Sequence, residues 1–240
     1  MRRFFVLALV LAVTLGLVAC GGDEPAEPEP TAAPAATEAP AATAEPETTA
    51  APEQKEGDAP AKTVFTIDPA RSTARYLIKE QLANRELPND AVGETMDVTG
   101  AIVLDADGKV VAGESQIVVG LDSLTSDSDR RDGYVRRRTL QTDQFPNATF
   151  VVREMQGLPW PLPTSGEVTV QMVGDLTVKD QTREVMWETV IQAGPSESTG
   201  LAKTQITFDQ YGMTKPSVAI VLSVVDEIRL EIDFTVVREK

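Results

Sequence analysis

Residues 228–236 read IRLEIDFTV, and apolar and polar side chains alternate along the whole stretch. A period of two places the apolar side chains on one face of a β-strand and the polar side chains on the other. The stretch therefore predicts an antiparallel strand with one buried face. Weaker forms of the same pattern occupy residues 65–67, 75–78, 98–104, 117–121, 150–152, 168–172, 185–189 and 204–208.

Turn-forming residues separate these stretches. Residues 105–109 read DADGK, which is typical of a hairpin turn. Residues 159–163 read PWPLP, and three alternating prolines remove N–H donors that a strand needs. Residues 179–181 mark another short turn. The sequence thus predicts one all-β domain of about eight strands, arranged as a barrel or as a sandwich.

One segment breaks the alternation. Residues 126–141 read SDSDRRDGYVRRRTLQ. Ser126 or Ser128 is a suitable N-cap, with acidic residues in the first turn and arginines near the last, and this order complements the helix dipole. Gly133 disfavours an uninterrupted helix. We expect a short helical segment between two strands.

The first twenty residues have the pattern of an export signal. Met1-Arg2-Arg3 is basic, residues 4–19 are an apolar run shorter than a membrane span, and Cys20 follows Leu17-Val18-Ala19. This ending resembles the lipobox of bacterial lipoproteins, in which the cysteine is lipidated. We therefore predict a lipoprotein signal peptide over residues 1–19 and lipidation of Cys20. An uncleaved signal anchor, or an ordinary signal with a chance cysteine, is the alternative.

Residues 20–62 predict a disordered tether. They contain half of the sixteen prolines and no aromatic residue, Leu, Ile or Val, so they cannot bury enough apolar surface to offset the entropy of ordering. Ten acidic residues and two lysines give the stretch a net charge of −8. The folded domain is expected to span residues 63–240.

Composition excludes several classes of function. The chain has no His and one Cys, which excludes His-dependent hydrolase machinery, imidazole metal sites and internal disulfides. A net charge of −15 argues against binding to nucleic acid. No phosphate-binding loop, nucleophile elbow or metal-ligand spacing occurs. The chain is therefore expected to be no enzyme and to need no cofactor or metal, although a pair of carboxylates remains open as a catalytic alternative.

Several short motifs recur in the order and spacing of one family. They are Phe65-Thr66-Ile67-Asp68 followed by Ser72, Tyr76, Thr125 with Arg131-Asp132, Phe145-Pro146 with Thr149-Phe150, Gly174-Asp175-Leu176-Thr177-Val178 with Thr182-Arg183, and Tyr211-Gly212. Together they resemble the YceI-like family across residues 64–237. The resemblance implies a lipocalin-like, eight-stranded antiparallel barrel. It also implies similarity to bacterial carriers that hold a long polyisoprenoid chain inside the barrel.

An eight-stranded barrel is wide enough for packed side chains or for one slim ligand. The candidate ligand contacts are the apolar side chains expected to point inward. They are Val168, Val170, Met172, Trp187, Ile206, Phe208, Leu230, Ile232 and Phe234. The alternative is that these side chains simply fill the barrel.

Arginines gather in the predicted helical segment of an otherwise acidic chain. Arg130, Arg131 and Arg137 are candidates for binding a pyrophosphate or quinone head group at the barrel mouth, because guanidinium groups suit such contacts. The alternative is a solvated helix face on which Arg131 pairs with Asp129 or Asp132.

Two functional hypotheses follow. The first is a non-catalytic, lipid-anchored extracytoplasmic carrier, on the periplasmic side if an outer membrane is present, that binds a polyisoprenoid or isoprenoid quinone. The second is a β-barrel that binds an envelope protein and no lipid. The sequence leaves open whether the domain forms a homodimer.

Overall fold

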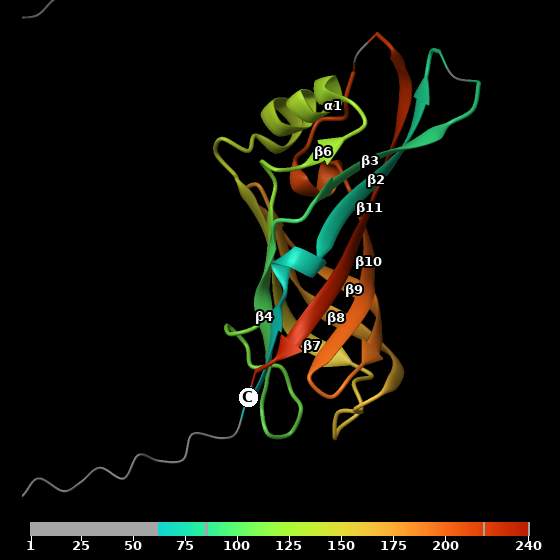
Figure 1. The fold of residues 1–240 in the computed structure, drawn as a ribbon. Coiled ribbons are helices and arrows are strands. Elements are labelled where there is room, and N and C mark those ends of the chain that lie inside the picture. Colours follow the sequence, from blue (N-terminus) through green and yellow to red (C-terminus); the bar gives the residue numbers. More distant parts are fainter. Residues whose placement is uncertain (1–61, 85, 218, 240) are drawn as a thin grey trace, which may run out of the picture. The chain divides into compact units, whose positions relative to one another are not determined.

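The computed structural model describes residues 62–84, 86–217 and 219–239, which form a β-barrel (Figure 1). The predicted signal peptide, the predicted lipidation site Cys20 and residues 20–61 of the predicted tether lie outside the described residues. No helix in the described ranges is long and apolar enough to cross a membrane.

Eight strands, each antiparallel to its neighbours, close into a ring. The ring closes where β1 pairs with the end of β11, with Thr66 opposite Val237. This closure decides between the barrel and the sandwich that the sequence left open. In ring order the strands are β1 (Thr63–Ile67), β4 (Val98–Leu104), β5 (Gln116–Gly120), β7 (Asn147–Gln156), β8 (Gly166–Val178), β9 (Gln181–Ala193), β10 (Glu197–Thr207) and β11 (Val221–Arg238).

Three further strands prolong the sheet from β11. They are β2 (Thr73–Leu82), β3 (Asn89–Thr95) and β6 (Thr125–Ser126). The 3₁₀ turn η1 (Pro69–Arg71) separates β1 from β2. At this interruption the Thr235 N–H of β11 donates a hydrogen bond to Ser72 Oγ at 3.1 Å, so a side chain replaces a backbone partner. Figure 1 shows β2 and β3 projecting beyond one end of the ring.

The alternation in residues 228–236 is confirmed as the inner face of β11. Ile228 and Ile232 are buried, and Leu230, Phe234 and Val236 pack against the same core. The other predicted stretches fall in strands to within one residue. The sequence missed β3 and β6, because β3 is largely polar and β6 has only two residues.

The predicted turn at residues 105–109 forms, but it does not lead directly into the next strand. The Asp105 N–H donates to the Lys109 carbonyl oxygen at 2.9 Å, and a single bridge joins Leu104 to Val110. Residues 105–115 together form the loop between β4 and β5. Ser115 fixes the end of this loop, because its hydroxyl accepts the Val103 N–H at 2.9 Å.

The predicted helical segment is confirmed as α1 (Asp129–Tyr134) followed by a π-helical turn, η2 (Val135–Leu140). Ser128 is the N-cap. The buried carboxylate of Asp132 accepts hydrogen bonds from the Ser126 N–H at 3.1 Å and the Ser126 hydroxyl at 2.5 Å. These contacts fix the segment to β6 at one end of the barrel (Figure 1). A further 3₁₀ turn, η3 (Asp209–Tyr211), follows β10.

Candidate functional site: two apolar cavities inside the barrel

The barrel interior is not filled by its own side chains. It contains two cavities. The volume that the centre of a water-sized sphere can occupy is about 100 Å³ in the first and about 140 Å³ in the second. A single water needs only about 10–15 Å³ by this measure, so each cavity has room for a ligand segment. This observation favours a hollow barrel over the alternative that the inward side chains fill it.

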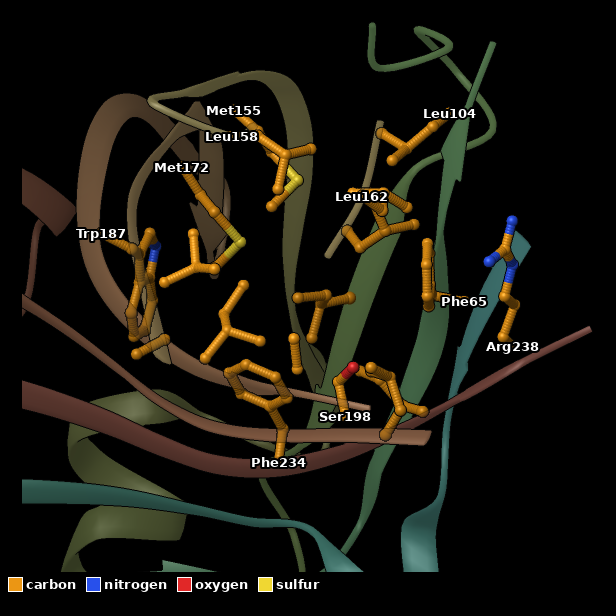
Figure 2. A pocket seen from close by; sticks show the side chains of 18 of the residues that line it. Phe65, Leu104, Met155, Leu158, Leu162, Met172, Trp187, Ser198, Phe234 and Arg238 are labelled. Atoms are coloured by element: carbon orange, nitrogen blue, oxygen red, sulfur yellow. The ribbon is translucent and has the colours of Figure 1, made fainter. Parts of the chain in front are cut away.

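The first cavity, hereafter the lower cavity, lies at the end of the barrel that holds the β7–β8 loop (Figure 2). Leu158, Leu162 and Pro163 of that loop contribute to its wall. Its other lining residues are Phe65, Ile67, Ile102, Leu104, Ile117, Phe150, Met155, Val168, Met172, Trp187, Ile191, Ala193, Gly194, Ser198, Ala202, Ile232, Phe234, Val236 and Arg238. The wall is almost entirely apolar.

The second cavity, hereafter the upper cavity, extends to the helical segment. Val135, Thr139 and Leu140 of η2 cover it. Its other lining residues are Ala74, Arg75, Tyr76, Ile78, Ile117, Val119, Leu121, Leu124, Ala148, Phe150, Leu176, Val178, Trp187, Ile206, Phe208, Met213, Pro216, Ile228, Leu230, Glu231 and Ile232. The helical segment therefore closes an apolar space rather than forming a separate surface.

Four residues line both cavities, and we call them the waist: Ile117, Phe150, Trp187 and Ile232. They come from β5, β7, β9 and β11. The rings of Phe150 and Trp187 lie with their centroids 5.8 Å apart and their planes at 51°, a tilted arrangement that aromatic pairs favour. A ligand that occupies both cavities has to pass these four side chains.

Eight of the nine predicted contact residues line at least one cavity. Val168, Met172 and Phe234 line the lower cavity, and Ile206, Phe208 and Leu230 line the upper cavity, while Trp187 and Ile232 belong to the waist. Val170 is buried at 1% exposure but lines neither cavity, so its side chain packs into the wall. Contact of these residues with a ligand stays a prediction.

The contributions of β1, β2, β4, β5, β7 and the β7–β8 loop to the cavity walls are not predicted from the sequence. The sequence predicts Phe150 and Ile117 as strand residues but does not predict that they lie at the waist. Alternation alone identifies an inward face, whereas the position along the barrel axis depends on the register between distant strands. Leu158 directly precedes the predicted proline-rich loop and Leu162 lies within it, and their apolar character is the available signal.

The candidate head-group arginines lie outside both cavities. Arg131 forms ion pairs with Glu80, at 2.9 Å, and with Asp127, rather than with the predicted partners Asp129 or Asp132. Glu80 is buried and belongs to β2, so its ion pair with Arg131 joins the helical segment to that strand. Burial lowers the pKa of Arg131, but the hydrogen bond that its guanidinium donates to Asp127 and the charge of Glu80 outweigh burial and raise that pKa above its ordinary value.

Arg130 and Arg137 are exposed and line neither cavity. Their predicted contact with a head group is therefore a contact at the outer surface of the helical segment. It stays a prediction.

Tyr76 carries a hydroxyl into the wall of the upper cavity. Its ring lies directly over Gly93 of β3, where a Cβ atom would come within 2.3 Å of the ring. Burial raises the pKa of Tyr76 to about 12, so the hydroxyl remains protonated at neutral pH.

Among the residues that the structure describes, no three His, Cys, Asp or Glu side chains gather in a way that could hold a metal ion.

Comparisons with known proteins agree with this architecture. The model of the YceI-like domain family matches residues 65–236. The chain belongs to this family. The family and the lipocalin-like barrel that its resemblance predicted are both confirmed. A search of curated proteins gives no match.

Two solved structures show the same fold as this YceI-like chain. One is a polyisoprenoid binding domain from Saccharophagus degradans, with a TM-score of 0.59 and 13% identity over 73% of this chain and 98% of that one. The other is BcnA from Burkholderia cenocepacia, with a TM-score of 0.52 and 15% identity over 70% of this chain and 98% of that one.

Proposed function

We propose that this YceI-like domain binds one long apolar lipid, a polyisoprenoid or an isoprenoid quinone, inside the barrel and carries it without chemistry. The observation that supports this most directly is the pair of apolar cavities that lie on either side of the waist residues. The structural likeness to a polyisoprenoid binding domain is consistent with the same ligand class.

The energetics favour a long ligand over a small one. Each methylene-sized group moved from water into an apolar cavity contributes about 0.8 kcal/mol. Association costs several kcal/mol in lost translational and rotational freedom, so a short molecule gains little. A chain of several isoprene units that occupies both cavities gains enough to bind firmly.

Cavity-filling substitutions test this proposal. Ala202→Phe places a ring at a buried position of the lower cavity, and Ala148→Phe places one at a partly buried position of the upper cavity. Both should lower the affinity for a fluorescent prenyl lipid at least about tenfold, because the added ring occupies ligand space. Ala112→Phe, on the exposed loop after β4, is the matched control and should leave affinity unchanged. Equal affinities in all three variants would contradict binding inside the barrel.

The proposed location is the outer side of the cytoplasmic membrane or the periplasm, with Cys20 as the lipid anchor and residues 20–62 as the tether. Two acyl chains on a cysteine suffice for stable anchoring. Cys20→Ser should move the protein from the membrane fraction to the soluble fraction of the source cells. Mass spectrometry of the mature N-terminus should show a diacylglyceryl cysteine, and an unmodified Cys20 in the native protein would contradict the proposal.

Exposed apolar side chains favour a second candidate function. Leu87 and Leu222, at 76% and 65% exposure, lie with Ile220 and Val225 in the projecting end formed by β2, β3 and the start of β11. Such a group is typical of a protein-binding surface. A stoichiometric envelope protein co-purifying with the chain, without extractable lipid, would favour this candidate over the carrier.

A further inference from the structure

The indole of Trp187 carries an unpaired hydrogen-bond donor in the centre of the barrel. The side chain is 3% exposed, and its Nε1 has no hydrogen-bond partner. Buried polar groups are almost always paired, and a buried donor without a partner costs free energy. An orphaned donor that faces a cavity therefore indicates that the cavity contents supply the acceptor.

The other side chains of the waist offer no good acceptor to this N–H. The other waist residues, Ile117, Phe150 and Ile232, have hydrocarbon side chains. Met172 lies opposite Trp187 on β8, and a thioether is only a weak acceptor. Figure 2 shows the Trp187 ring and the Met172 side chain on the same side of the lower cavity, with the indole nitrogen drawn in blue.

The Trp187 backbone is held in place independently of the indole nitrogen. Its carbonyl oxygen accepts a hydrogen bond from the buried Thr189 hydroxyl at 3.4 Å. The ring is also fixed by its tilted contact with Phe150. The donor is therefore preorganised, and a ligand that supplies an acceptor pays little to orient it.

We infer that Trp187 is a specificity-determining residue: its indole N–H donates a hydrogen bond to an oxygen atom of the ligand at the waist. This inference rests on the proposed carrier function and deepens it. The ligand is then an oxygen-bearing prenyl lipid, of which a prenyl quinone with its carbonyl acceptors is the type, rather than a pure hydrocarbon. The oxygenated head group lies at the waist, and the prenyl chain occupies a cavity.

The two parts of such a ligand are recognised by different chemistry. Hydrocarbon contacts along the cavity walls favour any prenyl chain, whereas a hydrogen bond discriminates against a ligand that lacks the acceptor. The lipid-stripped full-length protein can be tested with two probes that differ in this respect. They are a short-chain menaquinone, which has carbonyl oxygens, and squalene, which is a prenyl hydrocarbon.

The first readout is the indole N–H resonance in spectra of the ¹⁵N-labelled full chain, which has two tryptophans. Menaquinone should move the Trp187 indole proton downfield, as hydrogen bonding does, and squalene should not. Trp160 is 42% exposed and lines neither cavity, so its indole resonance serves as an internal reference. This measurement uses the wild-type chain, so its outcome does not depend on whether any variant folds.

The second readout is affinity. Trp187→Phe keeps an aromatic ring and removes the donor, and it should lower menaquinone affinity about tenfold while changing squalene affinity less than about twofold. The matched control Trp160→Phe should change neither. Equal losses for both probes, or bound menaquinone that leaves the Trp187 resonance unmoved, would overturn the inference while the carrier function stands. Binding of neither probe would contradict the carrier function and the inference together.

Discussion

Arg131, a candidate for head-group binding in the sequence, stabilises the fold through an ion pair with Glu80. Its guanidinium pairs with both Glu80 and Asp127, and its side chain is 20% exposed. A carboxylate as buried as Glu80 is costly without a charged partner. The helical segment is therefore bound to β2 through charge as well as through apolar contact.

Arg131→Ala should lower the free energy of unfolding by about 2–3 kcal/mol, because it leaves Glu80 buried without its cation. Arg137→Ala, at an exposed position of the same segment, should change it by less than about 0.5 kcal/mol. Denaturant unfolding of both variants measures the difference. Equal stabilities would contradict the structural role of Arg131.

The ionisation of Tyr211 should make the free energy of unfolding depend on pH in the alkaline range. The side chain is fully buried, and burial raises the pKa of its phenol from 10.0 to about 12. Between these values the unfolded chain releases the proton while the folded chain retains it, so the free energy of unfolding falls as pH rises. Stability from this group is fully present below pH 10.

Tyr211→Phe removes this ionisation. Between pH 9 and pH 11 the free energy of unfolding of the wild type should fall by about 1 kcal/mol more than that of the variant. Urea unfolding at the two pH values gives both slopes. Parallel losses in the two proteins would show that Tyr211 is not responsible.

Among the elements, β11 organises the barrel because it pairs with three different strands. Along its length it pairs with β10, β2 and, at its end, β1. The pairing with β1 is short, yet it converts a curved sheet into a closed ring. The last residues of β11 should therefore contribute more to stability than their number suggests.

Ending the chain after Thr235 removes the β1–β11 pairing, in which Val236 lies opposite Ile67, together with the last two residue pairs between β10 and β11. The melting temperature should fall by at least about 5 °C, because a barrel with an open edge loses these hydrogen bonds and the burial of Val236. Val237→Thr is the control, since Val237 is partly exposed and threonine also favours strands. An unchanged melting temperature in the truncated chain would contradict the importance of closure.

The elements that sequence predicted are those that local patterns determine. The alternation in β11, the Ser128 cap of α1 and the loop at residues 159–163 follow from neighbouring residues. The ion pair of Arg131 with Glu80 joins residues 51 positions apart, and the waist combines four separate strands. Such contacts depend on strand register and ring closure, which a local pattern does not contain.

At the scale of the whole molecule, the barrel is a container with two chambers. Its interior holds two spaces with largely apolar walls, and the unpaired indole N–H of Trp187 lies at their junction. A domain that only presents an outer surface to a partner has no need of such spaces, because filling them would add stability. The hollow interior is thus the feature that the carrier function explains.

Native mass spectrometry of the full-length protein, purified from membranes of its source and followed by organic extraction, tests the carrier function most directly. The carrier function predicts a discrete added mass on the folded protein that extraction releases as an oxygen-bearing prenyl lipid. A bare polypeptide mass that stays unchanged after incubation with prenyl lipids would contradict it.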